Sequence, residues 1–290
     1  MPNIHIVTDS CACFVNEQVL RQHPITVVPN TITIDGKAYR ENVDISPEDV
    51  LRLITQHPRS FTVSAPTAED YAAVYRRLSR DHDAIISIHA SRELYPCWQY
   101  ARLAVQQLAG HCEIAVIDSQ TIGAAQAMLT RVAGKAIQQQ ETLDNIIRIV
   151  RGAIERLYSI YYVETLDYLL KNKIMSASHT VLGTYLGIKP FLTLEEGHIA
   201  LVEKVRTRTQ AIDQMVEFIL EFTDIEDIAI LQHKAHLTEQ TRLLQDRLMM
   251  EYPGQYFPYA VYNPSLAALI GPDATGVVVL ECEWVEVDDE

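Results

Sequence analysis

The side chains best placed to do chemistry in this sequence come directly after two short apolar runs. The first run is followed by Thr8, Asp9 and Ser10, and the second is followed by Asp118 and Ser119. Each run predicts a β-strand, and the carboxyl ends of parallel strands line the ligand crevice of an open α/β sheet. A hydroxyl beside a carboxylate at that edge can hydrogen-bond a polar ligand. The same residues can instead cap the helices that follow, and both roles can hold together.

Two combinations of residues that include histidine could support catalysis or metal binding. His89, Ser91 and Asp118 have the side chains of a hydrolase triad, but the sequence contains no Gly-x-Ser-x-Gly turn to present the serine. His233 and His236 could ligate a metal from one face of a helix. They fall where a strand should end, however, and no cysteine or acidic trio accompanies them. Neither combination predicts an active site.

The cysteines predict free thiols in a reducing compartment. Their number is odd, they are scattered, and Cys11-Ala12-Cys13 lacks the second pair that a zinc site requires. The sequence has no glycine-rich loop of the Walker or dinucleotide type, and no charged leader precedes an apolar core at its N-terminus. We therefore expect a cytoplasmic protein that needs no metal, nucleotide or other cofactor. The five cysteines are Cys11, Cys13, Cys97, Cys112 and Cys282.

Composition and charge narrow the classes of partner. The formal net charge of −14 disfavours a nucleic-acid partner, because phosphate binding needs clustered lysine and arginine. No run approaches the ~20 apolar residues of a membrane span, so we expect none. Hydrophobic residues make up 48% of the chain, which is enough for substantial cores. A length of 290 residues suggests about two domains.

The order of predicted elements changes halfway along the chain. In the first half, strands alternate with helices, which predicts a parallel α/β sheet. The second half contains a hairpin, several helices and further strands, which is an α+β pattern. We therefore predict an α/β protein of two domains. An N-terminal parallel α/β sheet domain covers residues 1–160, and a C-terminal α+β domain covers residues 161–290.

The stretch Tyr161–Gln210 carries the most specific pattern. It predicts a short strand, two helices and then a hairpin that turns at residues 195–197. Its residues follow one another as in the DegV family, which has a Thr-Leu-x-Tyr-Leu helix, a Leu-Gly-x-x-Leu-x-Ile-Lys-Pro segment, a turn with glycine and then Lys-Val-Arg-Thr. The chain resembles that family at Thr165-Leu166, Tyr168-Leu169, Ile174, Leu182-Gly183, Leu186, Ile188-Lys189-Pro190, Gly197 and Lys204-Val205-Arg206-Thr207.

The resemblance extends over nearly the whole chain, because Thr-Asp-Ser near the N-terminus and Ile-Asp-Ser around Asp118 are also features of the family. It implies a protein that buries a long-chain fatty acid between an N-terminal α/β domain and a C-terminal α+β domain. It also implies a carrier rather than an enzyme. In the best understood members, the acid is presented to a separate kinase that phosphorylates its carboxylate. An acyl chain gains ~0.8 kcal/mol per methylene buried in such a tunnel.

The sequence departs from the family at the end where the resemblance places the headgroup. The threonine, serine and histidine that the family uses there correspond to Val63, Tyr95 and Leu269. The Gly-Gly-Arg turn of the family corresponds to Lys-Asn-Lys at 171–173, which keeps positive charge but loses the arginine fork. Either the ligand's headgroup differs, or other groups hold its carboxylate. The residues predicted to line this site are Thr62, Val63, Ser64, Ser91, Arg92, Tyr95, Leu269 and Gly271.

The resemblance also predicts a surface for a fatty acid kinase partner. Lys171, Lys173, Lys204 and Arg206 match the turn and strand that lie close to the headgroup opening in the family, so we expect a local basic patch on this acidic chain. Two alternatives stay open. One is an enzyme or binding protein that acts on a small polar substrate in the interdomain cleft. The other is a protein whose lipid serves mainly as structure.

Overall fold

The described part of the chain forms three β-sheets with helices packed around them. The computed structural model describes residues 3–56, 61–108 and 112–283. Its strands are β1 (Ile4–Asp9), β2 (Ile25–Val28), β3 (Thr31–Ile34), β4 (Lys37–Arg40), β5 (Phe61–Ser64), β6 (Ala84–His89), β7 (Glu113–Asp118), β8 (Leu157–Tyr162), β9 (Lys189–Glu195), β10 (His198–Val205), β11 (Ile225–Gln232), β12 (Tyr259–Val261) and β13 (Thr275–Glu281). Its helices are α1 (Gln18–Gln22), α2 (Pro47–Gln56), α3 (Ala68–Leu78), α4 (Cys97–Gln106), α5 (Ala124–Gln138), α6 (Leu143–Ile154), α7 (Asp167–Lys171), α8 (Ala177–Tyr185), α9 (Arg208–Leu220), α10 (Glu239–Glu251) and α11 (Pro264–Ile270).

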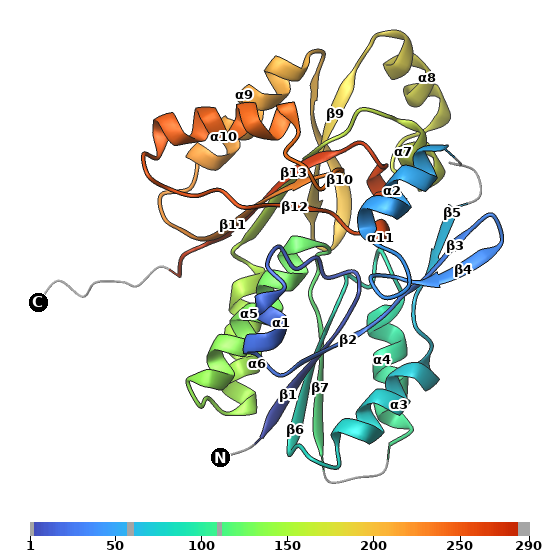
Figure 1. Ribbon diagram of the computed structural model, residues 1–290, viewed down its shortest axis with the longest axis vertical. Coiled ribbons are helices and arrows are strands. Elements are labelled where there is room, and N and C mark those ends of the chain that lie inside the picture. The colour runs from blue at the N-terminus through green and yellow to red at the C-terminus, as the bar shows by residue number, and fades with distance from the viewer. Residues whose placement is uncertain (1–2, 57–60, 109–111, 284–290) are drawn as a thin grey trace, which may run out of the picture.

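The N-terminal sheet is parallel and has helices on both faces. Its strand order is β2-β1-β6-β7, and each neighbouring pair runs in the same direction. Helices α5 and α6 lie on one face, and α3 and α4 lie on the other (Figure 1). Strands that are covered on both faces are apolar along their length, and all six residues of β6 are buried. This sheet confirms the parallel α/β architecture that the alternation of elements predicts.

The C-terminal sheet has six strands in the order β10-β9-β8-β13-β11-β12. Its pairs are antiparallel except for the parallel pair β11–β12. Helices α9 and α10 pack on one face and bury an apolar cluster that includes Phe191, Met215 and Leu244. Strands β9 and β10 pair antiparallel, which confirms the predicted hairpin.

Helix α5 lies between the two large sheets. It contacts β1 and β6 of the parallel sheet, and it contacts β8, β11 and β13 of the six-stranded sheet. Eleven of its 15 residues are buried, and five of these are alanines, so that small side chains let the helix approach both sheets. One continuous apolar core therefore includes Ile6 and Ile86 from the first half and Leu231 and Val278 from the second.

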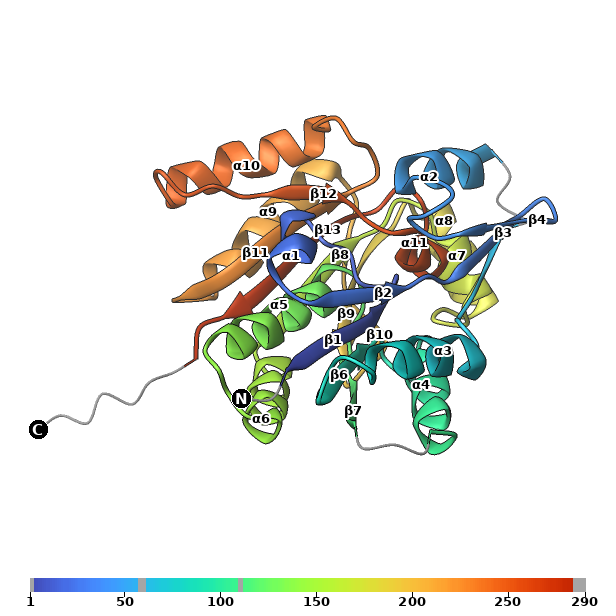
Figure 2. The same ribbon diagram turned by 60° about the horizontal axis from the view of Figure 1, so that its bottom comes forward.

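A third sheet, with the antiparallel order β4-β3-β5, lies beside α2, α7 and α11 (Figure 2). The turn between β3 and β4 places Asp35 at φ 49° and Gly36 at φ 78°, and a tight hairpin of this kind requires two residues with positive φ. Helix α11 packs against β5, α2 and α7. Elements from the two halves of the chain thus meet at α11.

The boundary predicted at residue 160 falls inside a strand. Strand β8 pairs with β13 and β9, so its residues on both sides of that position belong to the six-stranded sheet. A division of the chain into two domains near this strand stays a prediction.

Within the described residues, no helix is long and apolar enough to cross a membrane.

Candidate ligand site at helix α11

Tyr95 reaches from the parallel sheet to helix α11. Its backbone N–H donates to the carbonyl of Ser91 at 3.0 Å, so residues 91–95 form a tight turn ahead of α4. Its phenol O–H is buried and donates to the carbonyl of Ser265 in α11 at 2.9 Å. A phenol has one donor and can also accept. Tyr95 therefore offers a ligand an acceptor oxygen, because its donor is already used within the protein.

Strand β5 presents three of the predicted residues on alternate faces. Thr62 and Ser64 are exposed, whereas Val63 is half-buried and packs against the main core. Successive side chains of a strand point to opposite faces of the sheet. Val63 is therefore the one of the three that faces the interior, on a strand that packs against α11.

Leu269 and Gly271 form the end of α11. The side chain of Leu269 is buried and has no hydrogen-bonding group. Gly271 has a φ of 100°, and a Cβ at this position would lie 3.3 Å from the ring of Tyr168. Its carbonyl accepts a hydrogen bond from Tyr262 Oη at 3.0 Å. This end of the helix is tightly packed and gives a ligand no side-chain donor.

The turn after α7 fastens β5 to α11. Lys171 Nζ donates to the carbonyl of Phe61 at 3.1 Å. Asn172 Nδ2 donates to the carbonyls of Ala268 at 2.8 Å and Leu269 at 3.2 Å. These residues stand where the resemblance places a Gly-Gly-Arg turn. The departure from that turn thus supplies one hydrogen bond that joins the two halves of the chain, from Lys171, and others from Asn172 that hold α7 to α11.

Ser91 and Arg92 lie at a different edge of the junction. Ser91 Oγ donates to the carbonyl of Gly197 in the β9–β10 turn at 2.8 Å. Arg92 is exposed, and its Nε lies 3.2 Å from Glu93 Oε1 and 3.5 Å from Asp118 Oδ2. The Ser91 hydroxyl therefore fastens the parallel sheet to the hairpin instead of facing α11. Of the predicted site residues, the structure gathers four around α11: Val63, Tyr95, Leu269 and Gly271.

The predicted docking cations have unequal surroundings. All four side chains are exposed, but the amine of Lys171 also donates a hydrogen bond to the carbonyl of Phe61. Lys173 follows α7 with a φ of 59°, and Lys204 lies in β10. Whether these side chains form one basic surface for a partner stays a prediction.

A buried carboxylate that the sequence analysis missed lies next to Tyr95. Glu41 accepts hydrogen bonds from Ser10 Oγ at 2.6 Å, from Asn30 Nδ2 at 3.0 Å, and from the backbone N–H and Oγ of Ser265 at 2.8 and 2.6 Å. Burial raises the pKa of Glu41 to about 6, although these hydrogen bonds act to lower it. Glu41 and Tyr95 both hydrogen-bond to Ser265, so this buried cluster lies directly against α11.

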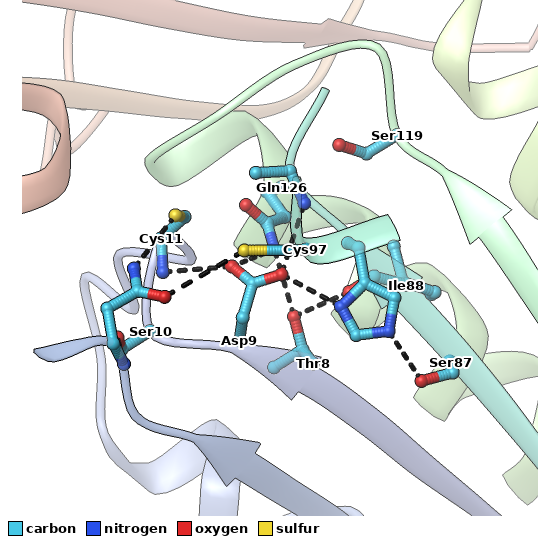
Figure 3. Close-up of polar contacts among 12 residues, drawn as sticks. Thr8, Asp9, Ser10, Cys11, Ser87, Ile88, Cys97, Ser119 and Gln126 are labelled. Atoms are coloured by element: carbon cyan, nitrogen blue, oxygen red, sulfur yellow. Dashed lines mark hydrogen bonds and ion pairs between the residues drawn. The ribbon is translucent and has the colours of Figure 1, made fainter. Parts of the chain in front are cut away.

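A second buried carboxylate, Asp9, lies at the end of β1 (Figure 3). His89 Nδ1 lies 2.8 Å from Asp9 Oδ2, and Oδ1 accepts from Gln126 Nε2 at 3.1 Å and from the backbone N–H of Cys11 at 3.0 Å. Burial acts to raise the pKa of Asp9. The hydrogen bond and charge of His89 are the largest of the interactions that lower it, and together these interactions leave the pKa of Asp9 below its ordinary value. His89 Nε2 lies 2.7 Å from Ser87 Oγ, and the whole chain of contacts is enclosed.

The hydrolase triad that the sequence analysis considered is not formed. His89 pairs with Asp9, Ser91 binds Gly197, and Asp118 accepts from the backbone N–H of Arg92 at 3.3 Å. Asp9 and Asp118 each accept a backbone hydrogen bond from the loop that follows their strand. The acids at the strand ends thus stabilise these loops.

A cavity of 630 Å³ lies between α2 and the loop that follows β11. Its lining includes Glu48 and Arg52 from α2, His233 and His236 from the loop, and Asp273. The two histidines precede α10, which begins at Glu239, so they do not share a helix face as a helical metal pair would. The cavity joins polar side chains from both halves of the chain.

The overall fold is that of a group of solved α/β proteins. A fatty acid binding DegV family protein from Streptococcus agalactiae superposes with a TM-score of 0.86 at 22% identity, which covers 98% of this chain and 100% of that chain. A stearic acid-binding protein from Eubacterium ventriosum superposes with a TM-score of 0.83 at 20% identity, which covers 96% of this chain and 98% of that chain.

The chain belongs to the DegV family. The model of that family, described as "Uncharacterised protein, DegV family", matches residues 3–281. A DegV domain-containing protein from Streptomyces coelicolor is 29% identical over 279 residues, which covers 96% of this chain and 98% of that relative. These matches confirm the family that the sequence resembles.

Proposed function

We propose that this protein binds a long-chain lipid, such as a fatty acid, with the polar end of the lipid at α11 between the two halves of the chain. The observation that supports this most directly is the meeting of Val63, Tyr95 and Leu269 around α11, because these residues stand where the family resemblance places the carboxylate site. Proteins of the same fold are described as fatty acid binding and stearic acid-binding. In this proposal the protein is a carrier and not an enzyme.

The headgroup is recognised in an altered way. A buried carboxylate must be hydrogen-bonded or paired, or it takes up a proton. Val63 and Leu269 carry no donor, and the O–H of Tyr95 is bound to Ser265. The acceptor oxygen of Tyr95 suits a headgroup that donates, such as a protonated acid or a neutral hydroxyl. A carboxylate held by Ser64 and the amides near Ser91 has weaker support, because Ser64 is exposed and the Ser91 hydroxyl binds Gly197.

The first test is to identify what the protein carries. Native mass spectrometry and solvent extraction of the purified protein should find a bound long-chain lipid. A protein that carries none, and that binds neither a fatty acid nor a neutral acyl ester with a free hydroxyl, would contradict the proposal as a whole.

The second test separates the two types of headgroup. Affinities for a fatty acid and for the neutral ester are compared in the parent, Tyr95→Phe and Ser64→Ala. Loss of one neutral hydrogen bond costs ~0.5–1.5 kcal/mol, so Tyr95→Phe should weaken binding of the donating headgroup about 2- to 12-fold. A loss of about tenfold or more for the fatty acid in Ser64→Ala would show instead that Ser64 holds a carboxylate, because bonds to charged groups cost ~1.5–3 kcal/mol.

A fatty acid kinase, where one acts on this protein, would dock over Lys171, Lys173, Lys204 and Arg206. Opposite charge on the kinase would make the encounter sensitive to salt. Because the usual headgroup donors are replaced, we expect a fatty acid kinase to phosphorylate fatty acid bound to this protein poorly. Efficient phosphorylation would contradict the altered headgroup while leaving lipid binding intact.

The cavity between α2 and the loop after β11 favours a second candidate function, the binding of a small polar molecule. Its volume of 630 Å³ and its lining by Arg52, His233, His236 and Asp273 suit such a ligand. The two functions differ in what the purified protein retains. A small polar compound without an acyl chain, found in place of lipid by native mass spectrometry, would favour this second function.

A further inference from the structure

Three side chains that can bind a metal ion meet inside the first half of the chain. A carboxylate oxygen of Asp9 and the Sγ atoms of Cys11 and Cys97 all lie within 4.8 Å of one another. Asp9 ends β1, Cys11 follows in the next loop, and Cys97 is the first residue of α4 (Figure 3). All three residues are fully buried. The sequence analysis expected no metal because Cys11-Ala12-Cys13 lacks a second pair, but the fold brings Cys97 to this position.

The Asp9 carboxylate is held in one orientation by four donors. They are His89 Nδ1 at 2.8 Å, Gln126 Nε2 at 3.1 Å, and the backbone N–H groups of Cys11 at 3.0 Å and Ala90 at 3.2 Å. Carboxylates that bind metals are commonly hydrogen-bonded in this way, since the supporting groups fix the direction of the ligand atom. An ion between the two sulfurs would replace one of these donors at the Asp9 carboxylate, and the other three would keep the carboxylate in place.

Asn30 contacts both sulfurs. Its Nδ2 donates to Cys11 Sγ at 3.1 Å, and its Oδ1 lies 3.8 Å from Cys97 Sγ. The Asp9 carboxylate lies beside both sulfurs, and its negative charge favours a cation placed between them.

We propose that Asp9, Cys11 and Cys97 bind a divalent cation of the zinc type. Zinc takes thiolate ligands at about 2.3 Å and carboxylate ligands at about 2.0–2.2 Å, so tetrahedral geometry sets neighbouring ligand atoms about 3.5–3.8 Å apart. The three ligand atoms lie within 4.8 Å of one another, so shifts of about an ångström or less would bring them to these distances. Two Zn–S bonds form as the two S–H protons leave to solvent. The bound ion ties the loop after β1 to the first turn of α4.

The experiment supplies zinc by two routes, because the ligands are enclosed. The full-length protein is produced in zinc-supplemented medium, and it is also refolded from urea with one equivalent of zinc under reducing conditions. We expect one zinc per chain to remain after gel filtration. With cobalt(II) in place of zinc, thiolate-to-cobalt charge-transfer absorption should appear. Because loss of a residue that only supports a metal ligand costs roughly 10–100-fold in affinity, Cys11→Ser and Cys97→Ser should each weaken binding more than about 100-fold.

Cys13→Ser is the matched control. Cys13 is also buried, but its Sγ donates to the carbonyl of Val261 at 3.4 Å. This variant should keep its zinc and its cobalt absorption. Thermal unfolding without metal checks that each variant folds, and added zinc should raise the midpoint for the parent and Cys13→Ser only. If a serine variant fails to fold, the parent decides the question, since zinc should slow the alkylation of Cys11 and Cys97 in urea that partly unfolds the chain.

Several results would overturn the metal site. One is a parent protein that retains no zinc by either route, and another is zinc retention that survives in both Cys11→Ser and Cys97→Ser. An equal loss in Cys13→Ser would show that the effect is not specific to this cluster. A Cys11–Cys97 disulfide that forms while zinc is present, with no zinc retained, would identify the cluster as a redox pair instead.

Discussion

The two large sheets bury different kinds of side chain. The carboxyl edge of the parallel sheet encloses polar and charged side chains such as Asp9, His89 and Gln126, and these bond to one another. The face of the six-stranded sheet under α9 and α10 is apolar. All strands of a parallel sheet end at the same edge, whereas antiparallel strands end alternately at opposite edges. The direction of the strands therefore decides where polar residues from distant parts of the chain can gather.

The largest expected loss of unfolding free energy comes from a substitution in the polar region at the end of the parallel sheet. His89→Ala leaves the buried Asp9 carboxylate without its closest hydrogen-bond partner, and removal of one partner of a buried pair costs ~3–5 kcal/mol. Urea unfolding at neutral pH measures this loss. Ser87→Ala is the control, because it removes only the hydroxyl on the other side of His89 and should cost about 1 kcal/mol. Equal losses in the two variants would mean that the contact between Asp9 and His89 contributes no more than an ordinary hydrogen bond.

The second prediction tests the apolar region by the same measurement. Met215 is fully buried between α9 and the six-stranded sheet. Met215→Ala should lower the free energy of unfolding by roughly 3 kcal/mol, because it removes buried apolar surface and leaves a cavity. Since no charge is involved, the loss should be the same at pH 5 and pH 7. A strong pH dependence would show that this core is coupled to a titrating group.

The third prediction uses pH to separate the two buried acids. The pKa of Glu41 is raised from 4.5 to about 6, so the folded state holds a proton that the unfolded state releases, and stability falls as pH rises from about 4.5 to 6. The difference of about 1.5 units corresponds to about 2 kcal/mol. The pKa of Asp9 is lowered from 3.8, so its stabilisation is present above that value and is lost only as pH falls further.

The measurement for Glu41 is the difference in unfolding free energy between the parent and Glu41→Gln across pH 4.5 to 7. The fall between about 4.5 and 6 should be present in the parent and absent from the variant. A parallel pair of curves would exclude Glu41 as the titrating group.

The smallest expected effect concerns the junction between the halves. Lys171→Met removes the hydrogen bond to the Phe61 carbonyl and should cost about 1 kcal/mol. Lys173→Met, two residues away and exposed, should change stability by less than about 0.5 kcal/mol. Thermal unfolding of the two variants side by side tests the contrast. A larger loss for Lys173→Met would contradict the stabilising role of the hydrogen bond between Lys171 and Phe61.

Much of the fold is predictable because its signals are local. Alternating strands and helices indicate the parallel sheet, and the turn at residues 195–197 indicates the β9–β10 hairpin. The placement of the small β4-β3-β5 sheet against α11 has no local signal. It depends on contacts such as that between Glu41 and Ser265, which are 224 residues apart in the chain.

The candidate site divides in the same way. Its residue types could be read from the resemblance, and the structure places Leu269 in α11, bonds Tyr95 to that helix and packs the strand of Val63 against it. The direction of each side chain could not be read, because Ser91 turns to Gly197, 106 residues away, and Lys171 turns to Phe61, 110 residues away. Glu41 was missed for the same reason. Nothing near it in the sequence shows that Ser10, Asn30 and Ser265 will surround it.

Helix α5 makes the two halves of the chain inseparable as folding units. It packs on the parallel sheet through one side and on the six-stranded sheet through another. A fragment that ends near residue 160 would keep α5 but leave the side that faces β11 and β13 open to water. Such an exposed alanine-rich surface invites association with other copies. Truncation should therefore yield an aggregating fragment, and the intact chain should unfold in a single transition and not one half at a time.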